Sequence, residues 1–277
     1  MKIFIIIIVL LVIILIWQIW ENNSLSVSHI KYTNSKIPKA FKGYRIVQIS
    51  DLHNKQFGKN QSKLIERIKE CNPDIVVITG DLVDDKRCSL DVSLEMSTSF
   101  VTQVSEIAPV YYVAGNHEAY TGEYKKIKQK LSETNINMLD NESVVISKNE
   151  EELMLIGVLD PYFYGGSESS NSKKLNNELK ELSDNDYFKV LLSHRPELMD
   201  IYVDNKIDLV FAGHAHGGQF RIPLIGGIIA PSQGFFPKYI DGEYVENDTT
   251  MIVSRGLGAS IIPIRIFNKP EIVLVEL

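Results

Sequence analysis

Two histidines, His214 and His216, stand one residue apart in the glycine-rich segment FAGHAHGGQ. The chain has six histidines, and His53, His117 and His194 also follow closely on short apolar runs. Imidazole is the commonest metal ligand among side chains. The positions of these histidines therefore predict a metal site that is built at the ends of strands.

Further residues of metal-ligand type follow the same kind of apolar run. The runs occupy residues 44–50, 74–79, 110–114, 187–193 and 208–212. The candidate ligands beyond them are Asp51, His53, Asp81, Asn116, His194, His214 and His216. Two carboxylates, four imidazoles and one amide suit Mn, Fe or Zn better than an all-oxygen Ca or Mg site. Seven groups exceed the four ligands of a structural zinc, so we expect two metal ions that share one carboxylate.

The apolar runs must be held by an α/β framework. They are rich in Val, Ile and Leu, which is typical of strands buried on both faces. Stretches with helical spacing, at residues 61–71, 90–107 and 124–134, alternate with them and favour an α/β body. In open α/β sheets, ligands bind beyond the carboxyl ends of the strands. The pattern therefore predicts one catalytic domain over residues 41–277.

The middle of this body has a different pattern. Residues 143–146 and 153–159 predict two strands joined by a polar turn. We expect residues 160–172 to form a loop and residues 175–182 to form a short helix.

Residues 3–20 form an apolar run that is broken only by Gln18. At ~1.5 Å per residue this run nearly spans a hydrocarbon core of roughly 30 Å. Trp17 and Trp20 lie at one end, Lys2 precedes the run and Glu21 follows it. The charges place the N-terminus in the cytoplasm and the body outside it.

A cleaved signal peptide is the alternative to an anchor. The apolar run is longer than the usual signal-peptide core of about 7–15 residues, and no small-x-small cleavage pattern follows it. We therefore expect an uncleaved, single-pass signal anchor over residues 1–22. Residues 23–40 would form a connector that includes a strand candidate at 24–31.

Composition narrows the classes of partner. The 277 residues are 44% hydrophobic and 23% charged, as in an ordinary globular protein, and the net charge is −6. An acidic body argues against a nucleic-acid partner, although bound cations would still permit a phosphate-bearing substrate. Cys71 and Cys88 form no CxxC pair. They could form a disulfide in an oxidising compartment or remain as two partly buried thiols.

The motifs resemble, in order, the five motifs of the calcineurin-like metallophosphoesterase superfamily. They are Asp51-x-His53, Gly80-Asp81-x-x-Asp84, Gly115-Asn116-His117-Glu118, His194, and Gly213-His214-Ala215-His216. The N-terminal anchor and the extension HGGQFR from His216 resemble the bacterial membrane-anchored branch. The resemblance implies a four-layer αββα sandwich with two mixed β-sheets.

The resemblance also implies a role for each motif residue. Asp51, His53 and His216 would bind one metal ion, Asn116, His194 and His214 the other, and Asp81 would bridge them. A hydroxide between the ions would attack phosphorus. His117, which is not a ligand, would stabilise the phosphoryl oxygens or protonate the leaving oxygen.

Several residues near the motifs have open roles. Glu118 stands where the superfamily more often has Asp, an acid thought to orient the neighbouring histidine, so its pairing with His117 is in question. Asp84 is interpreted as a supporting acid. Arg195 and Arg221 could hold substrate phosphate or pair with surface acids.

The resulting function is that of a membrane-anchored phosphoesterase acting on a phosphomonoester, phosphodiester or pyrophosphate. The apolar segment 222–239 follows the last motif. It could be a buried loop, or it could form an apolar lip of Ile228, Ile229, Phe235 and Phe236 that suits a lipid-linked or envelope substrate. The alternative class is a catalytically silent, metal-stabilised scaffold at the membrane surface. The presence of His117 favours the enzyme, because a scaffold does not need that acid.

Overall fold

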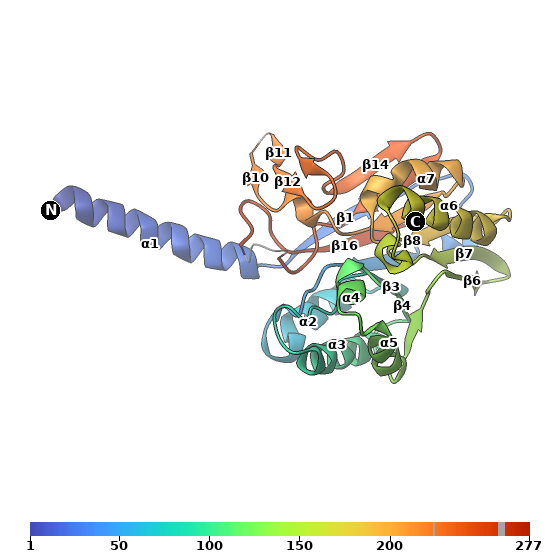
Figure 1. The fold of residues 1–277 in the computed structure, drawn as a ribbon, viewed down its shortest axis with the longest axis horizontal. Helices are drawn as coiled ribbons and strands as arrows, with labels where there is room; N and C mark the ends of the chain where they lie inside the picture. Colours follow the sequence, from blue (N-terminus) through green and yellow to red (C-terminus); the bar gives the residue numbers. More distant parts are fainter. Residues whose placement is uncertain (224, 260–263) are drawn as a thin grey trace.

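The structure is a computed structural model that describes residues 1–223, 225–259 and 264–277. Helix α1 (Lys2–Asn23) projects from a body built on two six-stranded sheets (Figure 1). Each sheet carries helices on its outer face, which gives four layers. This confirms the predicted αββα sandwich with a preceding apolar helix.

The first sheet is mixed, because β1 and β16 run parallel to each other and antiparallel to the other four strands. Its order is β1 (Ser26–Lys31), β16 (Glu271–Glu276), β2 (Arg45–Ile49), β3 (Ile75–Thr79), β4 (Val110–Val113) and β5 (Ile136–Met138). On the outer face lie α2 (Ser62–Glu70), α3 (Leu90–Ser105) and α5 (Tyr124–Ser132). The apolar side chains of these helices pack against sheet residues such as Val76 and Ile78 of β3.

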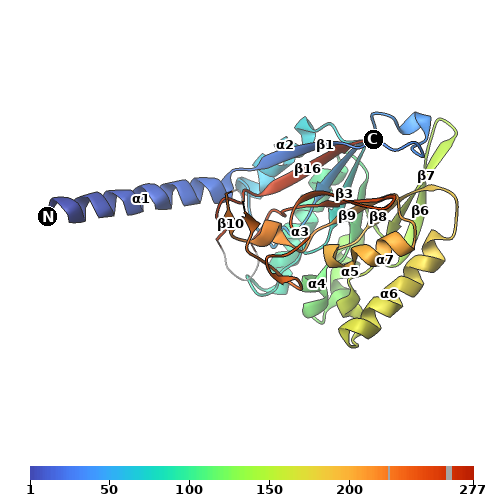
Figure 2. The same ribbon diagram turned by 90° about the horizontal axis from the view of Figure 1, so that it is seen from above.

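The second sheet is also mixed, because its two edge strands run antiparallel to their neighbours. Its order is β14 (Gly242–Glu246), β15 (Thr249–Val253), β9 (Leu209–Ala212), β8 (Phe188–Leu192), β7 (Glu151–Gly157) and β6 (Glu142–Lys148). Helices α6 (Glu168–Ser183) and α7 (Met199–Asp204) cover its outer face (Figure 2). The β6–β7 hairpin confirms the two strands that were predicted in the middle of the chain.

The core between the sheets explains the apolar runs. Val77, Val113, Leu155, Val190 and Phe211 meet there, and none of the five is exposed by more than 1%. The neighbouring residues on the same strands face the outer helices, so these strands are buried on both faces.

One local prediction was wrong. Helix α6 begins at Glu168 rather than near residue 175, because the Ser167 hydroxyl accepts the Ser170 N–H at the start of the helix. The helical stretch predicted at residues 90–107 is α3, which buries Val101 and Val104 and exposes Val92 in its first turn.

Residues 23–40 contain the predicted strand, which is β1. Strand β1 pairs with β16 along its full length, from Ser26 opposite Glu271 to Lys31 opposite Glu276. Cys71 and Cys88 are both free thiols, Cys71 buried and Cys88 partly buried.

Candidate metal centre

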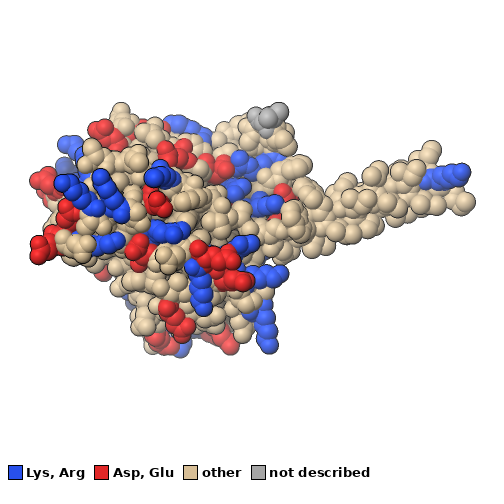
Figure 3. All heavy atoms as spheres, turned by 180° about the vertical axis from the view of Figure 1, so that it is seen from behind, with Lys and Arg blue, Asp and Glu red and all other residues tan. Residues whose placement is uncertain are grey.

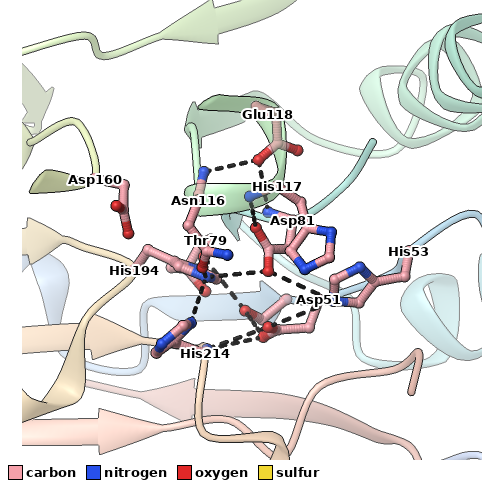
Figure 4. A network of polar contacts seen from close by, with 12 residues as sticks. Asp51, His53, Thr79, Asp81, Asn116, His117, Glu118, Asp160, His194 and His214 are labelled. Carbon is pink, nitrogen blue, oxygen red and sulfur yellow. Dashed lines mark hydrogen bonds and ion pairs between the residues drawn. The ribbon is translucent and has the colours of Figure 1, made fainter. Parts of the chain in front are cut away.

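Both sheets contribute residues to one polar cluster. Asp51 and His53 follow β2, Asp81 follows β3, and Asn116 follows β4 at the start of the short helix α4 (Asn116–Tyr120). His194 follows β8, and His214 and His216 follow β9. All seven side chains predicted as ligands are buried and lie together at the carboxyl ends of these strands, and Figure 4 shows most of them.

The backbone at this cluster is unusual. Asp51, His53, Asp81, His214 and His216 all have φ between 46° and 64°, in the left-handed region that non-glycine residues rarely adopt. Such strain is common at functional sites and persists only where the surrounding structure enforces it. Five of the seven predicted ligands share it.

A glycine precedes three of the seven predicted ligands, Asp81, Asn116 and His214, because no larger side chain fits at that position. A Cβ on Gly213 would lie 2.0 Å from Ser50 Oγ and 2.6 Å from Asp51 Oδ2. A Cβ on Gly80 would lie 2.7 Å from His194 Nδ1, and φ at Gly80 is +91°. The glycines in the motifs therefore make room for the ligand side chains of neighbouring strands.

Asp81 lies at the centre of the cluster. Its Oδ1 accepts the His117 backbone N–H at 2.9 Å, at the start of α4. Its Oδ2 lies 3.5 Å from His53 Nε2 and 3.2 Å from His194 Nε2. One carboxylate oxygen therefore faces two separate histidine groups.

The first group surrounds His53. Its Nε2 lies 3.3 Å from His216 Nε2, and His216 Nε2 lies 3.3 Å from Asp51 Oδ1. His53 Nδ1 contacts Asp84 Oδ2 at 3.2 Å, which leaves Nε2 free as an acceptor. Asp51, His53, Asp81 and His216 form one cluster that could hold a metal ion.

The second group surrounds His194. Its Nδ1 donates to the Thr79 carbonyl at 2.7 Å, and its Nε2 lies 3.1 Å from Asn116 Oδ1 and 3.2 Å from His214 Nδ1. His214 Nε2 faces the Ser232 hydroxyl at 3.2 Å, so the opposite nitrogen of each ring faces the cluster. Asp81, His194 and His214 form a second cluster that could hold a metal ion.

The spacings fit bound metal better than hydrogen bonding alone. Ring nitrogens face each other across 3.2–3.3 Å, where at most one proton can be shared. Ligands about 2.1 Å from one ion lie roughly 3.0–3.5 Å from each other in octahedral or tetrahedral geometry. The residues present therefore fit divalent metal ions.

Charge in the cluster is tightly coupled. Burial opposes ionisation of Asp81, but His194, His53 and His117 hold the pKa of its carboxyl well below the usual value. Burial likewise disfavours the charged form of His194, yet Asp81 and Asp51 raise the pKa of His194 to about 10. Burial lowers the pKa of His214 and of His216 well below the usual value.

Glu118 does not orient His117. Its two carboxylate oxygens accept four backbone N–H groups, at 2.7–3.0 Å, from Asp81, Leu82, Val83 and Gly115. His117 Nδ1 instead lies 3.5 Å from Asp84 Oδ1. The acid that supports His117 therefore comes from the second motif, and Glu118 fixes the loop that carries Asp81.

The arginines near the motifs pair with acids. Arg195 donates Nε and Nη2 to the two oxygens of Asp160, the second at 3.0 Å. Arg221 pairs with Asp241 at 2.6 Å. The Arg195 Nη1 also donates to Ser232 Oγ at 2.7 Å, and the serine faces His214. Sequence reasoning missed Ser232, which lies inside an apolar loop and carries no motif signal.

One cavity of about 360 Å³ reaches the centre at His53, and a second of the same volume lies beside Arg195 and Ser232, which contact His214. One is lined by His53, Lys55 and Arg87 among others, and the other by Tyr120, Tyr162, Arg195, Glu197 and Ser232 among others. Tyr120 lies beside His117, with their ring centroids 5.6 Å apart. Open space therefore lies beside His53 and beside two residues that contact His214.

Comparison with known proteins identifies the family. The family model for calcineurin-like phosphoesterases matches residues 44–218, which is more than half of the chain. The chain belongs to the calcineurin-like phosphoesterase family. It is therefore a phosphoester hydrolase, and the clustered ligand residues support divalent metal binding.

Three relatives are similar over most of this chain. An uncharacterized metallophosphoesterase, YkuE of Bacillus subtilis, is 29% identical, covering 88% of this chain and 82% of its own length. The phosphodiesterase YaeI of Escherichia coli is 28% identical, covering 84% and 82%. A transmembrane protein with a metallophosphoesterase domain from Danio rerio is 28% identical, covering 87% of this chain and 55% of its own length.

Proposed function

We propose that this chain is a membrane-anchored phosphoesterase that uses two metal ions sharing Asp81. The observation that carries the proposal is that Asp81 Oδ2 lies within 3.5 Å of a histidine nitrogen from each group. Asp51, His53 and His216 would complete one site, and Asn116, His194 and His214 the other. Two such ions, of Mn, Fe or Zn, supply a nucleophile near neutral pH and stabilise charge on the phosphoryl oxygens.

His117 is proposed as the acid that protonates the leaving oxygen. Its side chain is 14% exposed, whereas those of His53 and His194 are fully buried, so it can reach a substrate. Burial opposes its charged form, but the contact with Asp84 and the charge of Asp81 raise the pKa of His117. A protonated imidazole beside the reacting phosphorus suits general acid catalysis.

The surroundings favour a substrate with groups on both sides of the phosphorus. The cavity at His53 and the cavity beside Arg195 and Ser232 would accept the two substituents of a phosphodiester or pyrophosphate, whereas a monoester needs only one. Similarity to a phosphodiesterase supports the same choice.

An apolar lip beside the centre favours a lipid-linked substrate. Phe235 and Phe236 are each 72% exposed, so the segment 222–239 is not simply a buried loop. The same segment carries Ser232, which faces His214. An acyl or prenyl chain on the substrate would cover these rings while its phosphoester lies at the metal centre.

The N-terminal helix is proposed as an uncleaved anchor. Helix α1 has 22 residues and is long and apolar enough to cross a membrane, and none of its most apolar window is buried in the body. Lys2 precedes it, so the N-terminus would be cytoplasmic and the body extracytoplasmic. Residues 1–22 would be the anchor, 23–40 the connector, and 41–277 the catalytic domain.

Metal analysis and hydrolysis of the purified full-length chain test this function. We expect about two metal equivalents in the wild type and hydrolysis of bis-p-nitrophenyl phosphate with at least one of Mn, Fe or Zn. Asp81→Asn should abolish both the second equivalent and hydrolysis. The same change at the exposed Asp91 serves as the matched control and should alter neither.

A substrate panel tests the finer choices. Matched phosphomonoesters, diesters and pyrophosphates, each with and without an acyl chain, separate the bond that is cleaved from the preference for lipid. Faster hydrolysis of acylated than of soluble diesters would support the lip, provided that the double variant Phe235→Ala and Phe236→Ala loses this preference. Equal rates for acylated and soluble diesters would contradict the proposal that the lip binds a lipid chain.

A further inference from the structure

The last turn of α1 is packed into the catalytic body. Glu21 is only 4% exposed, and its Oε2 accepts the Phe267 backbone N–H at 3.1 Å. Asn22 exchanges two hydrogen bonds of 2.9 Å with the backbone of Arg265. The Trp17 ring lies 5.0 Å from that of Phe267, centroid to centroid. The helix therefore holds the body in one orientation rather than tethering it loosely.

The segment that receives α1 lies beside the loop of the last motif. Arg221 N donates to the Ile266 carbonyl at 3.0 Å, and Gln219 Nε2 donates to the Ile264 carbonyl at 2.7 Å. Strand β10 (Arg221–Ile222) then pairs antiparallel with β11 (Gly226–Gly227). Figures 1 and 2 both place β10 at the end of the body from which α1 projects.

Among the described residues of these segments, four apolar side chains are exposed. Ile222, Ile225, Ile264 and Phe267, here called the apolar collar, are 42–66% exposed. Trp20 of α1 is also exposed, next to the collar along the helix. Soluble proteins rarely leave such groups clustered in water, and clusters of this kind mark contact with a membrane or a partner.

Basic side chains accompany the collar. Lys269 Nζ lies 4.2 Å from the centroid of the Trp20 ring, and Lys55 Nζ donates to the Asn22 carbonyl at the end of α1. Figure 3 shows further Lys and Arg atoms around the base of the helix. Tryptophan and lysine together are typical of the level at which a transmembrane helix leaves the hydrocarbon core.

We propose that the apolar collar is a docking surface for the lipid bilayer in which α1 is anchored. The inference rests on the proposed anchoring and adds that the catalytic body lies against the membrane in one fixed orientation. Trp17, at the depth of the span, packs on the collar residue Phe267, so the collar lies at the membrane interface. The loop that follows β11 carries Ser232 to His214, so one segment of the chain joins the collar to the metal centre.

Lipid quenching of site-specific labels tests this surface. The full-length chain, with Cys88→Ser to leave only the buried Cys71, is placed in vesicles of phosphatidylcholine and phosphatidylglycerol. A fluorophore is attached at Ile222→Cys or Ile225→Cys, and at Val145→Cys as the control. Val145 is 38% exposed on β6, far from α1 (Figure 1).

We expect nitroxide lipids to quench both collar labels at least about twofold more than the control, because interfacial side chains lie roughly 5–10 Å into the headgroup region. Equal quenching at all three positions would overturn the proposal. Collar labels that are shielded from aqueous iodide but not quenched by lipid would also overturn it, since a protein would then cover the collar.

Flotation with the vesicles separates this inference from the anchoring itself. A chain that floats but shows no lipid quenching at the collar would keep the anchor and lose the docking surface. A chain that does not float would contradict the anchor and with it the docking surface. Hydrolysis of a soluble diester, measured in the same vesicles, reports the proposed activity independently of both outcomes.

Discussion

Asp84 places Oδ1 3.5 Å from Nδ1 of His117 and so supports this histidine from the second motif. Its other oxygen lies 3.2 Å from Nδ1 of His53. A single carboxylate thus orients one proposed metal ligand and the proposed acid. The two histidine rings meet edge to face, with centroids 4.4 Å apart, so their positions are linked.

Replacing Asp84 should therefore impair catalysis and metal binding together. We expect Asp84→Asn to lower kcat and metal affinity by roughly 10–100-fold each, as is usual for residues that orient metal ligands. Because Asp84 raises the pKa of His117, the alkaline limb of the kcat profile should move to lower pH. The exposed neighbour, Asp85→Asn, is the control, and an unchanged pH profile in Asp84→Asn would contradict the pairing.

Removing the imidazole of His117 should separate metal binding from turnover. We expect His117→Ala to keep its metal content and to lose about 10²–10⁴-fold in kcat, the usual contribution of a general acid. Activity on a diester with a very acidic leaving group should fall least, because that group leaves without a proton. Loss of metal from this variant would instead make His117 a ligand.

Glu118 is expected to matter for stability more than for chemistry. Glu118→Ala would leave four buried N–H groups without an acceptor. Each unsatisfied group typically lowers the free energy of unfolding by about 1–3 kcal/mol. Even if the loop relaxes in part, we expect the free energy of unfolding to fall by about 3 kcal/mol. For a body of this size that lowers Tm by roughly 6–12 °C. Thermal unfolding in detergent measures it.

The control for Glu118 is Glu123→Gln, an exposed acid just beyond α4. A shift of less than about 2 °C in Glu118→Ala, below the effect of 1 kcal/mol, would show that water replaces the carboxylate. Glu118→Gln should also destabilise, because its NH₂ would face N–H donors that a carboxylate accepts.

Metal binding should release protons. Asp81 and Asp51 raise the pKa of His194 to about 10 in the metal-free chain, so at pH 7.5 its ring is protonated. The ring must lose that proton before Nε2 can bind metal. Metal affinity should therefore rise with pH up to about 10. Calorimetry in buffers of different ionisation enthalpy measures the protons released, and a value near zero at pH 7.5 would contradict the raised pKa.

Metal removal should also lower thermal stability. Ligands bound only by the folded state stabilise it, by about 2.7 kcal/mol at a hundredfold excess over Kd. Chelation should thus lower Tm by roughly 5–11 °C, and added Mn or Zn should restore it. Asp81→Asn should show a smaller response, and an equal response in that variant would argue against Asp81 as a shared ligand.

The strands and the cluster could be predicted from sequence because both depend on local pattern. Val- and Ile-rich runs predicted β2, β3, β4, β8 and β9, and the polar residues directly after them identified the cluster. The fold was predicted by resemblance to a known family. Strand direction within each sheet depends on long-range pairing, which a run of apolar residues does not encode.

The contacts between distant segments could not be predicted. Asp84 and Glu118 lie 34 residues apart in sequence, and only the folded loops show which of them faces His117. Ser232 reaches His214 from a loop that reads as apolar. The packing of Glu21 and Asn22 on residues 265–267 links the two ends of the chain, and no local signal indicates it.

The pairing of β1 with β16 has a consequence for synthesis and export. Strand β1 follows directly on α1, and the partner to which it is hydrogen-bonded is the last strand of the chain. The anchor would therefore enter the membrane long before the first sheet is complete. Strand β1 would remain unpaired until residue 276 has been translocated across the membrane. Pairing over such a separation is intrinsically slow. Deletion of the last few residues should therefore leave an anchored chain with an open sheet edge, a form suited to recognition by proteases that survey the membrane surface.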